Sequence, residues 1–124
     1  MKALSTPAAP AAIGPYSQAI MAGDTVYVSG QLPINPSTSE FAEGGIKEQA
    51  RQSLNNIKNI LAEAGMTMQQ VVKVTVLMTD MSDFAAVNEV YAEFFSAPYP
   101  ARSAFAVAAL PKGGAIEIEA VAVK

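Results

Sequence analysis

Hydrophobic residues recur at helical spacing in two stretches of the chain. Between residues 46 and 64 the apolar positions form one stripe and the charged residues lie outside it. Gly65 follows, where a left-handed C-terminal cap is expected. A second helix is predicted to begin near Ser82, an N-cap candidate, and to stop before Pro98. The two stripes are Ile46, Ala50, Leu54, Ile57, Leu61 and Ala64, and then Phe84, Val87, Tyr91 and Phe94 or Phe95.

Other stretches are rich in β-branched residues or alternate in polarity, which is typical of strands. Residues 18–21 and 25–29 predict two strands joined by a short turn, and 71–79 predicts a third. Residues 103–110 and 115–123 flank a Pro-Lys-Gly-Gly turn and predict a long antiparallel hairpin. The stretch 32–45, with two prolines and a glycine pair, predicts a loop.

The resulting order is ββ-α-β-α-ββ, which indicates an α+β fold. At 124 residues one domain spanning 1–124 is expected. Two helices would cover one face of a mixed sheet. The other face, which we expect to be mostly alanine and valine, is the predicted contact with another subunit.

The composition changes this picture in two ways. Charged residues make up only 15% of the chain, so apolar surface is expected to face a second copy, and we predict a homo-oligomer. The net charge of -3 argues against nucleic acid as a partner. No apolar run approaches a membrane span, and the N-terminus lacks the apolar core of a signal peptide. A cytoplasmic protein is the best interpretation.

The chain has no cysteine and no histidine. It therefore has no disulfide, thiolate nucleophile, Ser-His-Asp triad or histidine-based zinc site. Its carboxylates show no metal-ligand spacing, and its glycines show no phosphate-loop pattern. An enzyme built from this inventory would work without metal or cofactor, through carboxylates, hydroxyls, amides and very few fixed cations.

Arg102 is the first candidate for a functional residue. It is one of two arginines and stands in a proline-braced segment directly before a predicted strand. A guanidinium offers a planar fork that suits a carboxylate. The alternative is a surface residue, or a partner for Glu117 or Glu119. These two glutamates are two positions apart on a strand and so share one face, either as a solvated pair or as carboxylates placed to hold or deprotonate a water.

Three further places could line a cleft. Tyr16 lies at the tip of a braced turn, although a tyrosine there is more often simply packed. Ser29 brings a hydroxyl to a strand end, and Gly30 after it permits close backbone approach. Asn88 lies on the second helix, where an asparagine is usually only solvated. None of these residues is specific on its own.

Taken together, these segments resemble the RidA family, also called the YjgF family. The match extends over nearly the whole chain, and its motifs occur in the right order and at compatible spacings. They are Ala12-Ile13-Gly14-Pro15-Tyr16, Ser29-Gly30-Gln31-Leu32-Pro33, Gln49-Ala50-Arg51-Gln52-Ser53-Leu54, Asp83-Phe84 with Val87-Asn88, Pro100-Ala101-Arg102-Ser103, and Ile116-Glu117-Ile118-Glu119-Ala120.

The resemblance implies a chorismate-mutase-like fold and a homotrimer with clefts between its subunits. It implies hydrolysis of reactive 2-imino acids or their enamine tautomers, such as 2-iminobutanoate and 2-iminopropanoate, to 2-oxo acids and ammonia. By the same resemblance, Arg102 grips the substrate carboxylate and Glu117 is associated with the water. Tyr16, Ser29, Gly30 and Asn88 take the family's substrate-binding positions. Many members have a cysteine after Arg-Ser, where this chain has Ala104.

Three functions therefore remain open at this point. The first is an imine deaminase, in which Arg102 fixes the carboxylate and Glu117 positions a water or accepts its proton. The second is a non-catalytic trimer that binds small carboxylates and regulates, since fold does not settle function. The third is a holdase-like protein that presents apolar surface. The sequence does not reveal the physiological imino acid.

Overall fold

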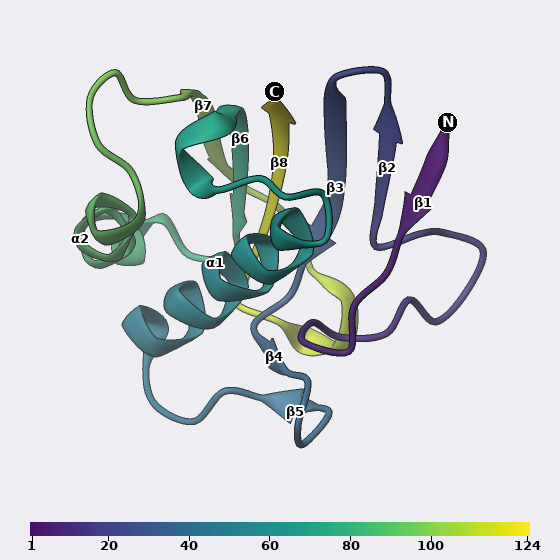
Figure 1. Cartoon of the computed structure of the whole chain (residues 1–124). Coiled ribbons are helices and arrows are strands. Elements are labelled where there is room, and N and C mark those ends of the chain that lie inside the picture. Colours follow the sequence, from purple (N-terminus) through teal and green to yellow (C-terminus); the bar gives the residue numbers. More distant parts are fainter.

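A six-stranded mixed sheet forms the back of the molecule, and both long helices lie in front of it (Figure 1). The computed structural model describes residues 1–124. The order across the sheet is β1-β2-β3-β8-β6-β7. The elements are β1 (Lys2–Leu4), β2 (Ala19–Ala22), β3 (Thr25–Gln31), β4 (Ile34–Asn35), β5 (Glu40–Phe41), α1 (Ile46–Ala62), the 3-10 helix η1 (Met68–Gln70), β6 (Val71–Met78), η2 (Met81–Asp83), α2 (Phe84–Phe94), β7 (Ala101–Ala106), η3 (Pro111–Gly113) and β8 (Ile116–Val123).

The predicted C-terminal hairpin is wrong. β8 does not pair with β7 but lies between β3 and β6, antiparallel to both. β7 pairs only with β6 and runs parallel to it. The parallel pair is possible because η2 and α2 make the crossover between these two strands. The central place of β8 also fits its sequence, because its inward residues Ile116, Ile118 and Ala122 are fully buried.

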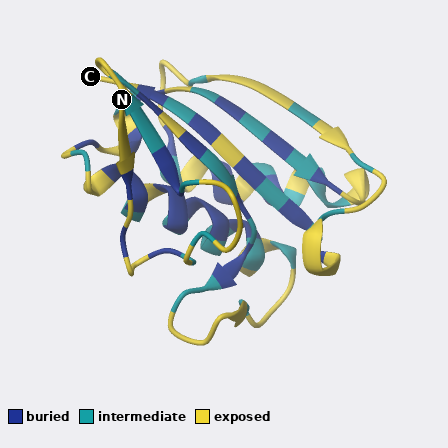
Figure 2. Cartoon of the chain, turned by 90° about the vertical axis from the view of Figure 1, so that its right-hand side faces the viewer, coloured by how far each residue is buried: buried dark blue, intermediate teal, exposed yellow.

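The core lies between the helices and one face of the sheet. The apolar stripe of α1 is buried, with Leu54, Ile57 and Leu61 all fully covered. On the strands, buried positions alternate with more exposed ones, as the banding in Figure 2 shows. The α+β prediction with two helices on one face is therefore confirmed, and so is Gly65 in the left-handed region after α1, with φ of 69°.

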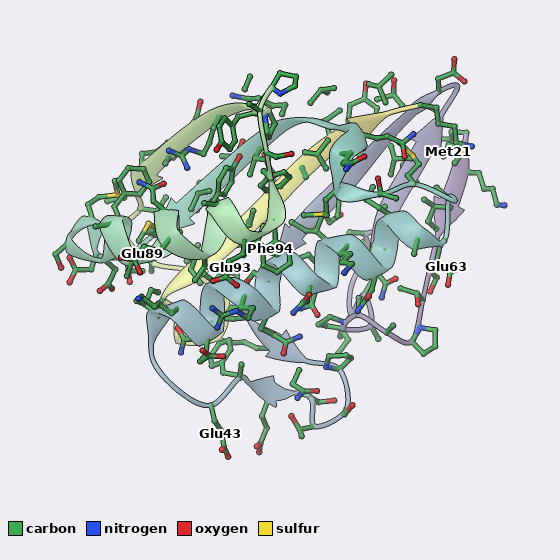
Figure 3. All side chains as sticks on the ribbon, turned by 60° about the vertical axis from the view of Figure 1, so that its left-hand side comes forward. Met21, Glu43, Glu63, Glu89, Glu93 and Phe94 are labelled. Carbon is green, nitrogen blue, oxygen red and sulfur yellow. The ribbon has the colours of Figure 1, made fainter.

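Solvent-exposed ion pairs join the neighbouring sides of the two helices. Lys47 and Arg51 on α1 bind Glu89 and Glu93 on α2. Both glutamates lie on the side of α2 that is turned toward α1 (Figure 3). The pairs are solvent-exposed, so each contributes little to stability, but together they favour one register of α2 on α1.

The uncovered face of the sheet is not the alanine- and valine-rich surface that was predicted. It carries polar groups such as Glu117, Glu119 and Thr75 together with large apolar ones. The apolar members include Tyr27, 53% exposed, and Phe105, 48% exposed. The alanines on β8 point instead toward the helices, where Ala120 and Ala122 are buried.

Three short strands were not predicted from the sequence. β1 adds to the sheet edge beside β2, and β4 and β5 form a small hairpin inside the predicted loop. All three are too short for a periodicity to register. The second helix begins at Phe84 rather than near Ser82, because Asp80 caps the preceding η2 by accepting from the Ser82 backbone N–H. Neither helix has the length and apolar composition that a membrane span needs.

Candidate functional site

A hollow of about 1200 Å³ lies between the N-terminal segment, the end of β3 and the start of β8. Four of the six predicted site residues line it, namely Tyr16, Ser29, Gly30 and Glu117. These four come from three separate parts of the chain, and they meet because β8 pairs beside β3 in the sheet. The predicted cleft residues at this end of the sheet are therefore gathered in one place.

Glu117 lies directly over Gly30. A side chain at position 30 would place its Cβ only 2.2 Å from Oε1 of Glu117, so the glycine makes room for the carboxylate. Glu117 has no hydrogen-bond partner or ion pair within the chain. Burial, and then the negative charge of Glu119, raise the pKa of Glu117 above its usual value. A carboxylate with these properties can hold a water and accept its proton.

Ser29 is fixed by three hydrogen bonds. Its hydroxyl donates to the carbonyl of Ser17 at 2.6 Å, and its backbone N–H donates to the carbonyl of Gln18 at 2.9 Å. Its own carbonyl accepts from the side chain of Gln31 at 3.2 Å. The strand register shifts between Val28 and Gln31, so Ser29 and Gly30 lie in a bulge, a device that re-aims side chains beside binding sites.

Tyr16 stands at the rim of the hollow. Its side chain is half-exposed at 52% and its hydroxyl makes no hydrogen bond within the chain. Gly14 makes the sharp turn before it, with φ of 121°, a backbone conformation that favours glycine. The phenol is therefore free to contact a ligand, rather than packed into the core.

Gln18 was not identified from the sequence, although it shapes the hollow. Its side chain is buried and binds only backbone groups of the N-terminal segment. Oε1 accepts from the N–H of Thr6, and Nε2 contacts the carbonyls of Thr6, Ala9 and Pro10. Asn59 on α1 adds a bond to the carbonyl of Ala8. The only sequence signal was a polar residue among the apolar positions of a predicted strand.

Arg102 and Asn88 lie elsewhere. Arg102 projects from β7 toward α2, where its Nη1 donates to Oδ1 of Asn88 at 2.8 Å. Its guanidinium carbon lies 5.1 Å from the ring centre of Phe84 and 4.7 Å from that of Tyr91. The two rings and the amide fix the plane of the guanidinium and leave most of its N–H groups free. The apolar pattern predicted Phe84 and Tyr91 as core residues only, yet with Asn88 they form an i, i+4, i+7 stripe.

The two groups of residues lie on opposite faces of the sheet. Arg102 is in register with Val74, whose side chain points toward the helices. Glu117 is in register with Leu77, three residues further along β6 and therefore on the other face. Arg102 consequently has no contact with either glutamate, and the alternative that it pairs with Glu117 or Glu119 is wrong.

Each of the two groups has its own chemistry. The group around Arg102 presents hydrogen-bond donors and a fixed positive charge, which suits a carboxylate. The group around Glu117 presents an unpaired carboxylate and hydroxyl groups. No group of three or more acidic side chains comes together in a way that would hold a metal ion.

Comparison with known proteins agrees with this architecture. The family model described as Endoribonuclease L-PSP matches residues 6–124, so the chain belongs to that family, the RidA or YjgF family that its motifs resemble. A 2-iminobutanoate/2-iminopropanoate deaminase from Capra hircus is 54% identical over 98% of this chain and 88% of its own.

Two solved structures show how closely the fold is shared. RidA from the Antarctic bacterium Psychrobacter is 52% identical, superposes with a TM-score of 0.96, and the match covers 100% of both chains. TdcF from E. coli, solved with bound serine, is 46% identical with a TM-score of 0.95, over 100% of this chain and 99% of its own. The predicted family and fold are therefore confirmed.

Proposed function

We propose that this protein is an imine deaminase, which hydrolyses 2-imino acids or their enamine tautomers to 2-oxo acids and ammonia. The observation that carries the proposal is the guanidinium of Arg102, held between two rings and one amide with most of its N–H groups free. Its complement is the unpaired carboxylate of Glu117. Relatives about half identical to this chain are named 2-iminobutanoate/2-iminopropanoate deaminases.

We infer further that the active form is a homotrimer with its sites between subunits. Arg102 and Glu117 face opposite sides of one sheet. A substrate that is only four or five heavy atoms long therefore cannot contact both residues of the same chain. A neighbouring copy that brings its Arg102 to the mouth of the hollow would complete the site. The exposed Tyr27 and Phe105 on the open face supply apolar surface for such a contact.

The proposed reaction needs little from the protein, because a protonated imine is already electrophilic. Arg102 binds the carboxylate and aims the imine carbon at a water held by Glu117. Glu117 takes a proton from that water as oxygen adds to the carbon. It then passes the proton to nitrogen, ammonia leaves, and the carbonyl forms as the hydroxyl proton is released. The balance is one iminium and one water in, one 2-oxo acid and one ammonium out.

The family description also mentions endoribonuclease activity, which the charges of this chain do not favour. The net charge is -3, and the hollow is lined by Glu117, Glu119 and a single cation, Lys112. RNA binding draws on clusters of lysine and arginine. A small anionic substrate that needs one arginine fits better.

A non-catalytic trimer that binds small carboxylates is the second candidate. TdcF, a structural neighbour, was solved with serine bound, so a related chain holds a small amino acid. This candidate predicts saturable binding of 2-oxo acids that depends on Arg102, without faster loss of imine. The cytoplasm remains the predicted location for either function.

The deciding experiment generates 2-iminobutanoate in situ with a threonine dehydratase and follows its decay. Wild type is expected to accelerate the decay, and Arg102→Ala to lose about 100-fold in kcat/KM because the carboxylate is no longer fixed. Arg51→Ala is the matched control, since Arg51 binds Glu48 and Glu93 on the helices, away from both half-sites. Equal decay with wild type and Arg102→Ala would reject the proposal. Sedimentation of a monomer at micromolar concentration would reject the shared site.

A further inference from the structure

The hydroxyl of Ser29 has already committed its only hydrogen. Oγ lies 2.6 Å from the carbonyl oxygen of Ser17, and a carbonyl cannot donate, so the hydroxyl must. What Ser29 can present to the hollow, which it lines, is therefore only lone pairs. It is an acceptor toward any ligand.

This excludes one role and favours another. A substrate carboxylate has no hydrogen to give, so it gains nothing from an acceptor. A protonated imine carries two N–H donors, and the carbonyl of the product carries none. We propose that Ser29 accepts a hydrogen bond from the imine N–H and so makes the site selective for a nitrogen-bearing substrate over the 2-oxo acid product; this inference rests on the proposed deaminase function.

The arrangement around Ser29 supports this assignment. Ser29 is held in a bulge by its backbone N–H and carbonyl as well as by its hydroxyl, so its oxygen is fixed in place. The next residue, Gly30, lies directly under the carboxylate of Glu117. Two acceptors thus stand side by side on one wall, one for the imine nitrogen and one for the water.

This division of labour has a consequence for the proton. Because Ser29 cannot give up its hydrogen without breaking the bond to Ser17, it cannot protonate the leaving nitrogen. That proton comes from Glu117, which has taken it from the attacking water. Ser29 orients the nitrogen and Glu117 moves the proton.

The substrate is then bound along its dipole. The negative carboxylate lies at the donor side formed by Arg102, and the positive iminium lies at the acceptor side formed by Ser29 and Glu117. Hydrolysis replaces N–H donors by a carbonyl oxygen, which faces two acceptors. The product is therefore held less tightly than the substrate, and this favours its release.

The test compares two planar ligands of nearly the same shape. Oxamate carries an NH2 group where 2-oxopropanoate carries a methyl group, and both carry the same carboxylate. Isothermal titration is expected to give wild type about a 3- to 10-fold preference for oxamate, the size of one hydrogen bond. Ser29→Ala is expected to bring the two affinities within twofold, and Ser29→Thr, which keeps the hydroxyl, to retain the preference.

Ser17→Ala is the matched control, because only the backbone carbonyl of Ser17 takes part in the bond and its side chain does not line the hollow. Should Ser29→Ala weaken both ligands equally, the hydroxyl donates to the carboxylate and the inference is overturned. A preference for oxamate that survives in Ser29→Ala overturns it as well. The deaminase proposal is judged separately, by the Arg102→Ala decay assay.

Discussion

Replacing Gly30 by alanine tests whether the carboxylate of Glu117 depends on the space above this glycine. The backbone of Gly30 lies outside the left-handed region, so alanine can adopt it without strain. The added methyl carbon would nevertheless lie 2.2 Å from Oε1 of Glu117 and 2.8 Å from its Cδ. The substitution therefore displaces the carboxylate of Glu117 without changing its chemical identity.

The displacement can be sized from the contact distances. Ordinary van der Waals contacts begin near 3.4 Å, so the carboxylate oxygen must retreat by a little over 1 Å. A misplacement of about 1 Å at a reacting group lowers the rate by about 100-fold, or about 2.7 kcal/mol. The loss is expected in kcat, while KM changes little, because Arg102 still binds the carboxylate.

The assay is the decay of 2-iminobutanoate generated in situ, with thermal unfolding measured in parallel. Gly45→Ala serves as control, since that glycine also has an ordinary backbone conformation and nothing within 4 Å of an added Cβ. In a Glu117→Ala background, Gly30→Ala should have almost no further effect, because the clash is gone. A folded Gly30→Ala protein that keeps more than a third of the wild-type kcat would refute the reasoning.

Two further predictions concern stability. Glu117→Gln is expected to raise stability at neutral pH by only about 0.5 kcal/mol once solvent screening is allowed for, because it removes a half-buried charge beside Glu119, while abolishing the proton transfer. Because the pKa of Glu117 is raised in the folded state, wild type loses stability as pH rises through that pKa. Urea unfolding at a series of pH values should therefore show the stability gain from Glu117→Gln shrinking as the pH falls toward 4.5. Wild-type kcat should rise as the pH increases over the same range, because Glu117 loses its proton. A stability gain that does not depend on pH would contradict this. Tyr91→Phe removes a buried hydroxyl without a partner and keeps the ring, so calorimetry at fixed protein concentration should show about 1 kcal/mol more stability. A lower Tm would mean that the hydroxyl is bonded in solution.

The helices and the central strands could be predicted because their own side chains specify them. The stripe of α1 and the β-branched residues of β6 carry a period that needs no knowledge of neighbours. Strand partners are different, because alternation tells which side chains point inward but not which strand lies alongside. The strands β7 and β8 are close in sequence, yet β6 lies between them in the sheet. β7 pairs in parallel with β6 at the edge, and β8 takes a central place.

The candidate site residues could be proposed from the sequence, but their arrangement in space could not. Glycine at position 30 suggested close approach by a backbone, whereas the approaching group is the side chain of Glu117. Asn88 was weighed as a residue that could line a cleft or be merely solvated, and no pattern in the sequence indicated its hydrogen bond to Arg102. That Arg102 and Glu117 face opposite ways follows from strand register, which no local pattern encodes.

The hydrogen bonds between Gln18 and the N-terminal segment bear on which side chains of that segment can be replaced. Every group that Gln18 holds there belongs to the backbone, at Thr6, Ala9 and Pro10, and Asn59 likewise binds a backbone carbonyl. Hydrogen bonds from Gln18, which directly precedes β2, and from Asn59 on α1 thus help to hold the path of this segment. Side chains of this segment that line the hollow can therefore be exchanged in this chain while the backbone hydrogen bonds that hold it are kept.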